Sequence, residues 1–257
     1  MEGAGLVHHH RNLHGHVGYH ALRWSSASRR GRGRSRNEDA VLAVGGVFVV
    51  ADGMGGLAHG STASAIAVSY LGDLAGTDRP PSIDTVREAC RATDDSIARE
   101  AARHGVPMGT TVVGLIIAER VGIVGPSVVH VGDARCYVRH GGVTRQVTAD
   151  RVVGAEAAAA DPAQVGRLTR YLGAGGGGEV DVCSITATSS RVLVCSDGLH
   201  RAASLSMIDR ALGACDTPAD VVEMLTRLLE DGEQPDDASW VVIDLVAGPS
   251  RAVPARR

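Results

Sequence analysis

Acidic residues lie at the ends of four short apolar stretches of this sequence. Asp52 follows the β-branched run 47–51. Asp133 and Asp197 follow two similar runs, and Asp236 stands shortly before a fourth. Carboxylates at strand ends can converge on one rim of a sheet sandwich, where like charges are unstable without cations. Because Mg²⁺ and Mn²⁺ prefer oxygen ligands, the sequence predicts a metal centre around Asp52.

Two divalent ions held close together indicate hydrolysis of a phosphate ester. A water that bridges two such ions becomes a hydroxide near neutral pH and can attack phosphorus in line. The basic tract 29–36 runs directly into Glu38 and Asp39, which we expect to join the centre. Within this tract we expect Arg34 to hold the phosphate oxygens, because a planar guanidinium can bind them in bidentate fashion.

Hydrophobic patterning predicts the elements that position these residues. Strands are predicted over 21–27, 40–51 (two strands that turn at Gly45-Gly46), 110–118, 127–131, 135–139, 182–188, 191–195 and 240–246, with 182–188 and 191–195 paired. Helices are predicted over 57–74, 83–104, 205–212 and 217–229, with Ser82 and Thr217 as N-caps. We expect 150–167 to form a short helix or a mobile flap. Segregated batches of strands and helices favour an α+β fold with layered antiparallel sheets.

Composition narrows the function classes. The chain has 257 residues, of which 44% are hydrophobic, enough for one large domain with its own core. Its net charge of −3 gives no indication of a nucleic-acid or anionic-membrane surface, so we expect neither partner. All 26 basic residues are arginine, which excludes a P-loop lysine and a Schiff-base lysine.

Cellular location and the chain ends follow from simple patterns. The 5 cysteines contain no Cys-x-x-Cys pair, and no apolar run approaches the roughly 20 residues of a membrane helix. We therefore expect a cytoplasmic protein with reduced thiols, and a monomer. Histidines crowd residues 1–20 without periodicity, so this segment is predicted to be a flexible leader, and 248–257 a flexible tail.

A set of motifs in register carries a resemblance to a known family. They are 34–39 (RSRNED), 51–56 (ADGMGG), 109–111 (GTT), 131–135 (VGDAR), 168–173 (LTRYLG), 195–199 (CSDGL) and 236–239 (DDAS). In this order the chain resembles the bacterial branch of the PPM (type 2C) metal-dependent serine/threonine protein phosphatases. The resemblance covers about residues 21–246. It implies a phosphatase domain at 21–247, folded as a four-layer αββα sandwich with two Mn²⁺ or Mg²⁺ ions between two central antiparallel sheets.

The resemblance also implies roles for single residues. Asp52 would bridge both metal ions and the nucleophilic water, and the Gly53 carbonyl would ligate one ion. Asp197 and Asp236 would complete the first ion, and Glu38 would serve the second, directly or through water.

Three further residues complete the implied site. Asp39 would stand behind Glu38 at the second ion. Asp133, with Asp197, matches a third metal site of bacterial members, and Arg34 sits at the position of the phosphate-binding arginine. The implied substrates are proteins phosphorylated on serine or threonine, and the implied partners are kinases or their substrates.

The chain departs from the family pattern at several positions. Met54 replaces a histidine that serves many members as a proposed general acid, and the sequence does not identify another acid. The usual Asp-His-Ser reads Asp150-Arg151-Val152, and Asp237 replaces an asparagine. These changes keep open an alternative, a catalytically weak phosphatase-like module with a regulatory binding role.

Two short motifs of the sequence are also compatible with a cysteine-dependent phosphatase and with a dinucleotide-binding enzyme. Cys195 and Arg201 have the spacing of a cysteine-dependent phosphatase loop, but Asp197 inside that loop would repel phosphate. Residues 53–58 imitate a dinucleotide fingerprint, but Asp52 would face the pyrophosphate. We therefore favour the metal-dependent phosphatase over both.

Overall fold

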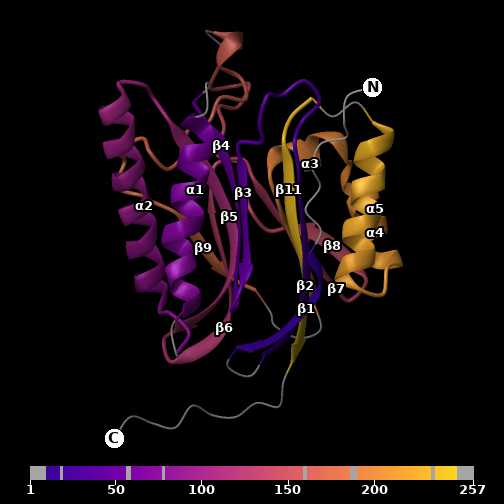
Figure 1. The fold of residues 1–257 in the computed structure, drawn as a ribbon. Coiled ribbons are helices and arrows are strands. Elements are labelled where there is room, and N and C mark those ends of the chain that lie inside the picture. The colour runs from indigo at the N-terminus through magenta and orange to yellow at the C-terminus, as the bar shows by residue number, and fades with distance from the viewer. Residues whose placement is uncertain are drawn as a thin grey trace, which may run out of the picture.

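Two antiparallel β-sheets face each other at the centre of the protein, and helices cover both outer faces (Figure 1). The computed structural model describes residues 10–17, 20–55, 59–76, 79–158, 161–185, 190–232 and 235–247. The 6-stranded sheet has the order β1 (His10–Val17), β2 (His20–Arg29), β11 (Ala238–Ala247), β10 (Ser190–Cys195), β7 (Arg135–His140) and β8 (Val143–Gln146). The 5-stranded sheet has the order β3 (Asp39–Val44), β4 (Val47–Met54), β5 (Gly109–Arg120), β6 (Ile123–Val131) and β9 (Asp181–Ser184). The predicted αββα sandwich is confirmed.

Each outer layer packs on one sheet. Helices α1 (His59–Gly72) and α2 (Ile83–His104) cover the 5-stranded sheet, and α4 (Leu205–Ala214) and α5 (Pro218–Asp231) cover the 6-stranded sheet (Figure 1). The short α3 (Asp197–Ala202) follows β10 directly. Among the described residues, no helix is long and apolar enough to cross a membrane.

Strand β4 shows why the apolar runs are continuous. Val47, Val49 and Ala51 pack toward the helices, whereas Phe48 and Val50 pack between the sheets. All of them are at most 1% exposed. A strand buried on both faces must be apolar at every position, and the alternation fixes which face each side chain meets.

The predicted N-caps Ser82 and Thr217 are confirmed. The Ser82 hydroxyl accepts a hydrogen bond from the backbone N–H of Thr85, and α2 ends at Gly105, whose φ of 68° lies in the left-handed region. At the start of α5, Thr217 and Asp220 form a reciprocal capping box ahead of Pro218.

The predicted pairing of 182–188 with 191–195 is wrong. Strand β9 pairs with β6 in one sheet, whereas β10 pairs with β7 and β11 in the other. Burial explains the difference. Strand β10 is enclosed, as a central strand must be, whereas β9 is half-buried to exposed at a sheet edge. The chain therefore changes sheets between Ser184 and Ser190.

The structure also corrects the predictions at the N-terminus and for the flap. Residues 10–17 form β1, which pairs antiparallel with β2, so the predicted leader does not extend to residue 20. Residues 1–9 and 248–257 lie outside the described residues. In the described part of 150–167, the helical structure is limited to the 3₁₀ turn η2 (Pro162–Gln164). Of the two predicted alternatives, this segment therefore agrees better with a flap than with a short α-helix.

Candidate functional site

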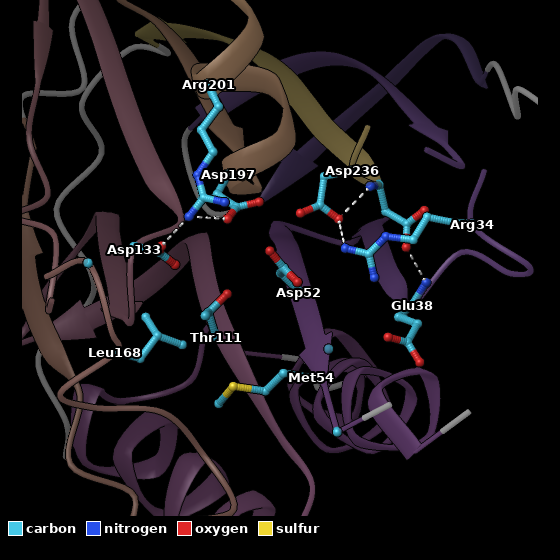
Figure 2. A pocket seen from close by; sticks show the side chains of 14 residues that line it. Arg34, Glu38, Asp52, Met54, Thr111, Asp133, Leu168, Asp197, Arg201 and Asp236 are labelled. Carbon is cyan, nitrogen blue, oxygen red and sulfur yellow. Dashed lines mark hydrogen bonds and ion pairs between the residues drawn. The ribbon is translucent and has the colours of Figure 1, made fainter. Parts of the chain in front are cut away.

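A cavity of about 310 Å³ lies where strands of both sheets end (Figure 2). The site residues predicted from the sequence that line it are Arg34, Glu38, Asp52, Gly53, Asp133, Asp197 and Asp236. Asp39 is not among the lining residues. The structure therefore brings together carboxylates that are up to about two hundred residues apart in the chain, as the strand-end pattern predicts.

The pleat of β4 aims Asp52 into this cavity. Phe48 and Val50 face the opposite sheet, and Asp52 continues their alternation at the end of the strand. Thr111 of β5 lies directly opposite Asp52 in the register and lines the same cavity. The two polar side chains thus occupy the space that hydrophobic residues fill farther along the sheets.

Glycines allow the surrounding backbones to approach closely. A Cβ on Gly53 would lie 2.0 Å from the Gly60 carbonyl oxygen, and a Cβ on Gly60 would lie 2.9 Å from the Glu38 carboxyl carbon. A Cβ on Gly198 would lie 2.0 Å from the Asp237 carbonyl oxygen. Each Asp-Gly pair therefore sets a carboxylate beside a backbone contact that only glycine permits.

Asp237 ties the basic loop to the cavity. Its Oδ1 atom accepts a hydrogen bond from the Gly31 N–H and its Oδ2 atom accepts one from the Glu38 N–H, both at 2.8 Å. The residue is 4% exposed. Sequence reasoning treated Asp237 only as an added negative charge. Its role in holding Glu38 depends on a contact that no local pattern signals.

The clustered carboxylates disfavour their own negative charge. Burial, and then the carboxylates of Asp39 and Asp197, raise the pKa of Asp52 well above its ordinary value. Burial likewise raises the pKa of Asp197 to about 6 and that of Asp39 to about 7. A divalent cation among these groups would oppose every one of these shifts, because it favours the ionised form.

Two arginines already neutralise part of the cluster. Arg34 donates to the Asp236 carboxylate, and Arg201 contacts Asp197 at 2.8 Å and Asp133 at 3.4 Å (Figure 2). In the described part of the chain, no three carboxylate, imidazole or thiol side chains are arranged to hold one metal ion. Each guanidinium therefore offsets part of the negative charge that gathers at the cavity.

The donor atoms nevertheless fit hard divalent ions. The carboxylates and the Gly53 carbonyl offer only oxygen, which Mg²⁺ and Mn²⁺ prefer. Thr111 Oγ1, at the cavity, is buried without a hydrogen-bond partner among the described residues. Buried polar atoms normally have partners, so this orphaned oxygen fits a site for a hydrated ion.

Among the residues that the structure describes, no histidine lines this cavity. His59 lies beside His104, with ring centroids 5.5 Å apart and the rings tilted by 51°, and His130 is buried beside Asp181, 3.8 Å away. Met54 occupies the cavity wall. The general acid is therefore not identified by the structure either.

The two rival chemistries find no support. Cys195 is 0% exposed, and burial raises the pKa of its thiol, which opposes formation of the thiolate nucleophile. A dinucleotide site would also need an acidic residue about 20 positions farther on, at the tip of a second strand. The residue at that distance, Asp73, opens the 3₁₀ helix η1 (Asp73–Gly76) after α1.

Comparison with known proteins indicates the same family as the sequence motifs. Residues 27–241 match the family model described as protein phosphatase 2C. The serine/threonine protein phosphatase PstP of Mycobacterium tuberculosis is 32% identical over 247 residues, which are 88% of this chain but 45% of that protein. The chain thus spans about half the length of this relative.

A further relative matches a shorter part of the chain, and a solved structure matches its fold. The serine/threonine phosphatase stp of Listeria monocytogenes is 33% identical over 197 residues, which cover 66% of this chain and 75% of that protein. Among solved structures, the catalytic domain of PstP in complex with 2 manganese ions has a TM-score of 0.75 at 28% identity, covering 88% of this chain and 99% of that one.

Proposed function

The chain belongs to the protein phosphatase 2C family, and we propose that it is a metal-dependent phosphatase that removes phosphate from phosphoserine and phosphothreonine in proteins. The observation that carries this proposal is the convergence of Asp52, Asp197 and Asp236 beside Arg34 in one cavity. Those carboxylates come from both sheets, so the fold itself assembles the site.

We assign the ligands of two metal ions from the residues that the sequence predicts. Asp52 and the Gly53 carbonyl, with Asp197 and Asp236, would hold one ion, and Asp52 with Glu38 would hold the other. Two Mn²⁺ or Mg²⁺ ions bound there supply an activated water for attack on phosphorus. The solved structure of the PstP catalytic domain contains 2 manganese ions, which supports a centre of this kind.

Residues of the chain orient the reactants around that centre. Arg34 exchanges its bond with Asp236 for two bonds to phosphate oxygens, as guanidinium geometry favours. Asp237 holds the Glu38 backbone, and Asp39 supports the cluster from behind, where its Oδ2 accepts a hydrogen bond from the Ser196 hydroxyl at 2.8 Å. Met54 and Leu168 add apolar wall to the cavity and limit access of bulk water.

We further propose that the enzyme is a cytoplasmic monomer whose substrates are supplied by serine/threonine kinases. The 5 cysteines are free thiols, which supports a reducing compartment. The family assignment supports the substrate class, since the relatives are serine/threonine phosphatases.

A Mn²⁺-dependent assay with p-nitrophenyl phosphate and a phosphothreonine peptide tests the activity. We expect turnover by the wild type and a loss of roughly 100-fold or more in D52N, because the bridging carboxylate contributes several kcal/mol to the metal-dependent step. The exposed helix residue Asp95 provides a control, D95N, that should keep full activity. An inert wild type that still binds Mn²⁺ and phosphopeptide would instead identify a regulatory binding module.

A further inference from the structure

Arg201 stands between two carboxylates that are far apart in the chain. Its Nη2 atom lies 2.8 Å from Asp197 Oδ2 and 3.4 Å from Asp133 Oδ2 (Figure 2). Asp197 opens α3, which follows β10 of the 6-stranded sheet, and Asp133 lies in the connection from β6 of the 5-stranded sheet to β7 of the 6-stranded sheet. A single guanidinium therefore faces two carboxylates from separate parts of the chain.

This contact differs from a surface ion pair because both of its carboxylates are buried. Asp133 and Asp197 are each 7% exposed, whereas the Arg201 side chain is 58% exposed and enters from the solvent side. Enclosed carboxylates need a positive charge, and a cation that faces both of them meets this need. Arginine stays protonated at every pH at which the protein is folded, so its charge is permanent.

The loop that carries Asp133 has its own anchors. The Asp133 carbonyl oxygen lies 3.0 Å from His200 Nε2, and the Gly132 carbonyl oxygen accepts a hydrogen bond from the Arg151 N–H at 2.7 Å. These contacts do not involve the Asp133 carboxylate. The loop can therefore keep its place when Arg201 is replaced, and the carboxylate remains available to another cation.

We propose that Arg201 is a built-in cation that takes the place of a metal ion between Asp133 and Asp197. The enzyme then binds two divalent ions and excludes a third, because a second cation in that position would meet the guanidinium charge at close range. Asp133 serves as a partner of Arg201 and not as a metal ligand. This inference rests on the proposed function only in that Asp197 also serves the binuclear centre.

Counting bound Mn²⁺ by equilibrium dialysis with elemental analysis tests the proposal. We expect two ions per chain in the wild type and in R201K, which keeps the charge, and three in R201A and R201Q, which remove it. The third ion should disappear in R201A/D133N. A crystal of R201A should show an anomalous manganese peak between Asp133 and Asp197.

A matched control removes another arginine with the same spacing. Arg227 forms an exposed i,i+4 pair with Glu223 on α5, outside the cavity, so R227A should bind as many ions as the wild type. The proposal is overturned if the folded R201A and R201Q variants bind no more Mn²⁺ than the wild type, or if the wild type binds three ions and D133N two. A wild type with fewer than two ions would contradict the proposed binuclear centre. Even in that case, the difference in bound Mn²⁺ between R201A and the wild type would test the role of Arg201 separately.

Discussion

The Asp237 carboxylate accepts a hydrogen bond from the backbone N–H of Glu38, 199 positions away in the chain, at 2.8 Å. The same carboxylate accepts the Gly31 N–H at 2.8 Å. One buried side chain therefore fixes both ends of the basic loop that carries Arg34 to the cavity. The relationship couples the last strand of the fold to the first carboxylate of the site.

Replacing Asp237 should loosen that loop and weaken metal binding. D237A leaves two backbone N–H groups without their acceptor, so we expect the free energy of unfolding to fall by about 1–3 kcal/mol. Because Glu38 loses its anchor, Mn²⁺ affinity should fall roughly 10- to 100-fold. D237N keeps one carbonyl oxygen and should lie between. Urea unfolding and calorimetric titration measure both effects, and an unchanged affinity in D237A would show that Glu38 is positioned by other contacts.

Asp94 of α2 should be a second structural anchor. Its carboxylate accepts N–H groups of Gly173 at 2.6 Å, Gly177 at 2.9 Å and Gly178 at 3.0 Å. The residue is 1% exposed. Loss of three charge-assisted hydrogen bonds should make D94A less stable by roughly 3 kcal/mol or more in urea unfolding.

The neighbouring Asp95 supplies the control for Asp94. It lies on the same helix but is exposed, so D95A should change stability by less than about 0.5 kcal/mol. Equal stability losses in D94A and D95A would contradict the anchoring role. The loop matters to the site because Leu172 pairs with Thr110, next to Thr111 of the cavity.

Local pattern was enough to predict most of the fold. The spacing of apolar residues and the cap at Ser82 predicted 83–104 as a helix, and α2 has those bounds. Where the structure differs, the deciding contacts are not local. Strand β8 is short and mostly exposed, and α3 has 6 residues, too few to show a helical period. The 182–188 segment was assigned to the wrong partner because neighbours in sequence usually pair, and here they belong to different sheets.

The residues of the site also fall into those that a local pattern predicts and those that depend on distant contacts. Carboxylates such as Asp52 and Asp197 can be identified in the sequence because a charged residue at the end of a buried strand requires a partner. Their convergence follows from the sandwich, although their roles as ligands stay predictions. Arg201 was considered only as part of a cysteine loop, since its partner Asp133 lies 68 residues away. Charge pairing across sheets has no signature in a single sequence.

The half-buried imidazole of His200 should make stability depend on pH. Burial, and then the positive charge of Arg135, lower its pKa to about 4 from 6.5. The unfolded chain therefore binds a proton that the folded chain does not bind, so this contribution is present above pH 6.5 and is lost as the pH falls. Between pH 7 and pH 5 the wild type should lose about 2 kcal/mol more stability than H200Q. Urea unfolding at both pH values measures the difference, and parallel pH profiles for the two proteins would contradict it.

Metal removal should invert the stability order of the wild type and D52N. In EDTA, Asp52 is a half-buried carboxylate among other carboxylates, so D52N should be more stable than the wild type. With Mn²⁺ at 100 times its dissociation constant, the wild type should gain about 2.7 kcal/mol and D52N much less. Thermal unfolding in both buffers shows whether the order reverses. If D52N is the less stable protein in EDTA as well, Asp52 has a structural role that does not depend on metal.

Arg34 should oppose metal binding and promote phosphate binding. It donates to Asp236, so its guanidinium and a metal ion at Asp236 would compete for the same carboxylate. R34A should therefore bind Mn²⁺ a few-fold more tightly, while kcat/KM for a phosphothreonine peptide falls roughly 100-fold because the phosphate loses its bidentate partner. R34K should recover little activity, since an ammonium group cannot make the paired contact. Calorimetric titration and steady-state kinetics separate the two effects. Weaker Mn²⁺ binding in R34A would mean that Arg34 holds Asp236 in place for the ion, and that its guanidinium is not the competitor.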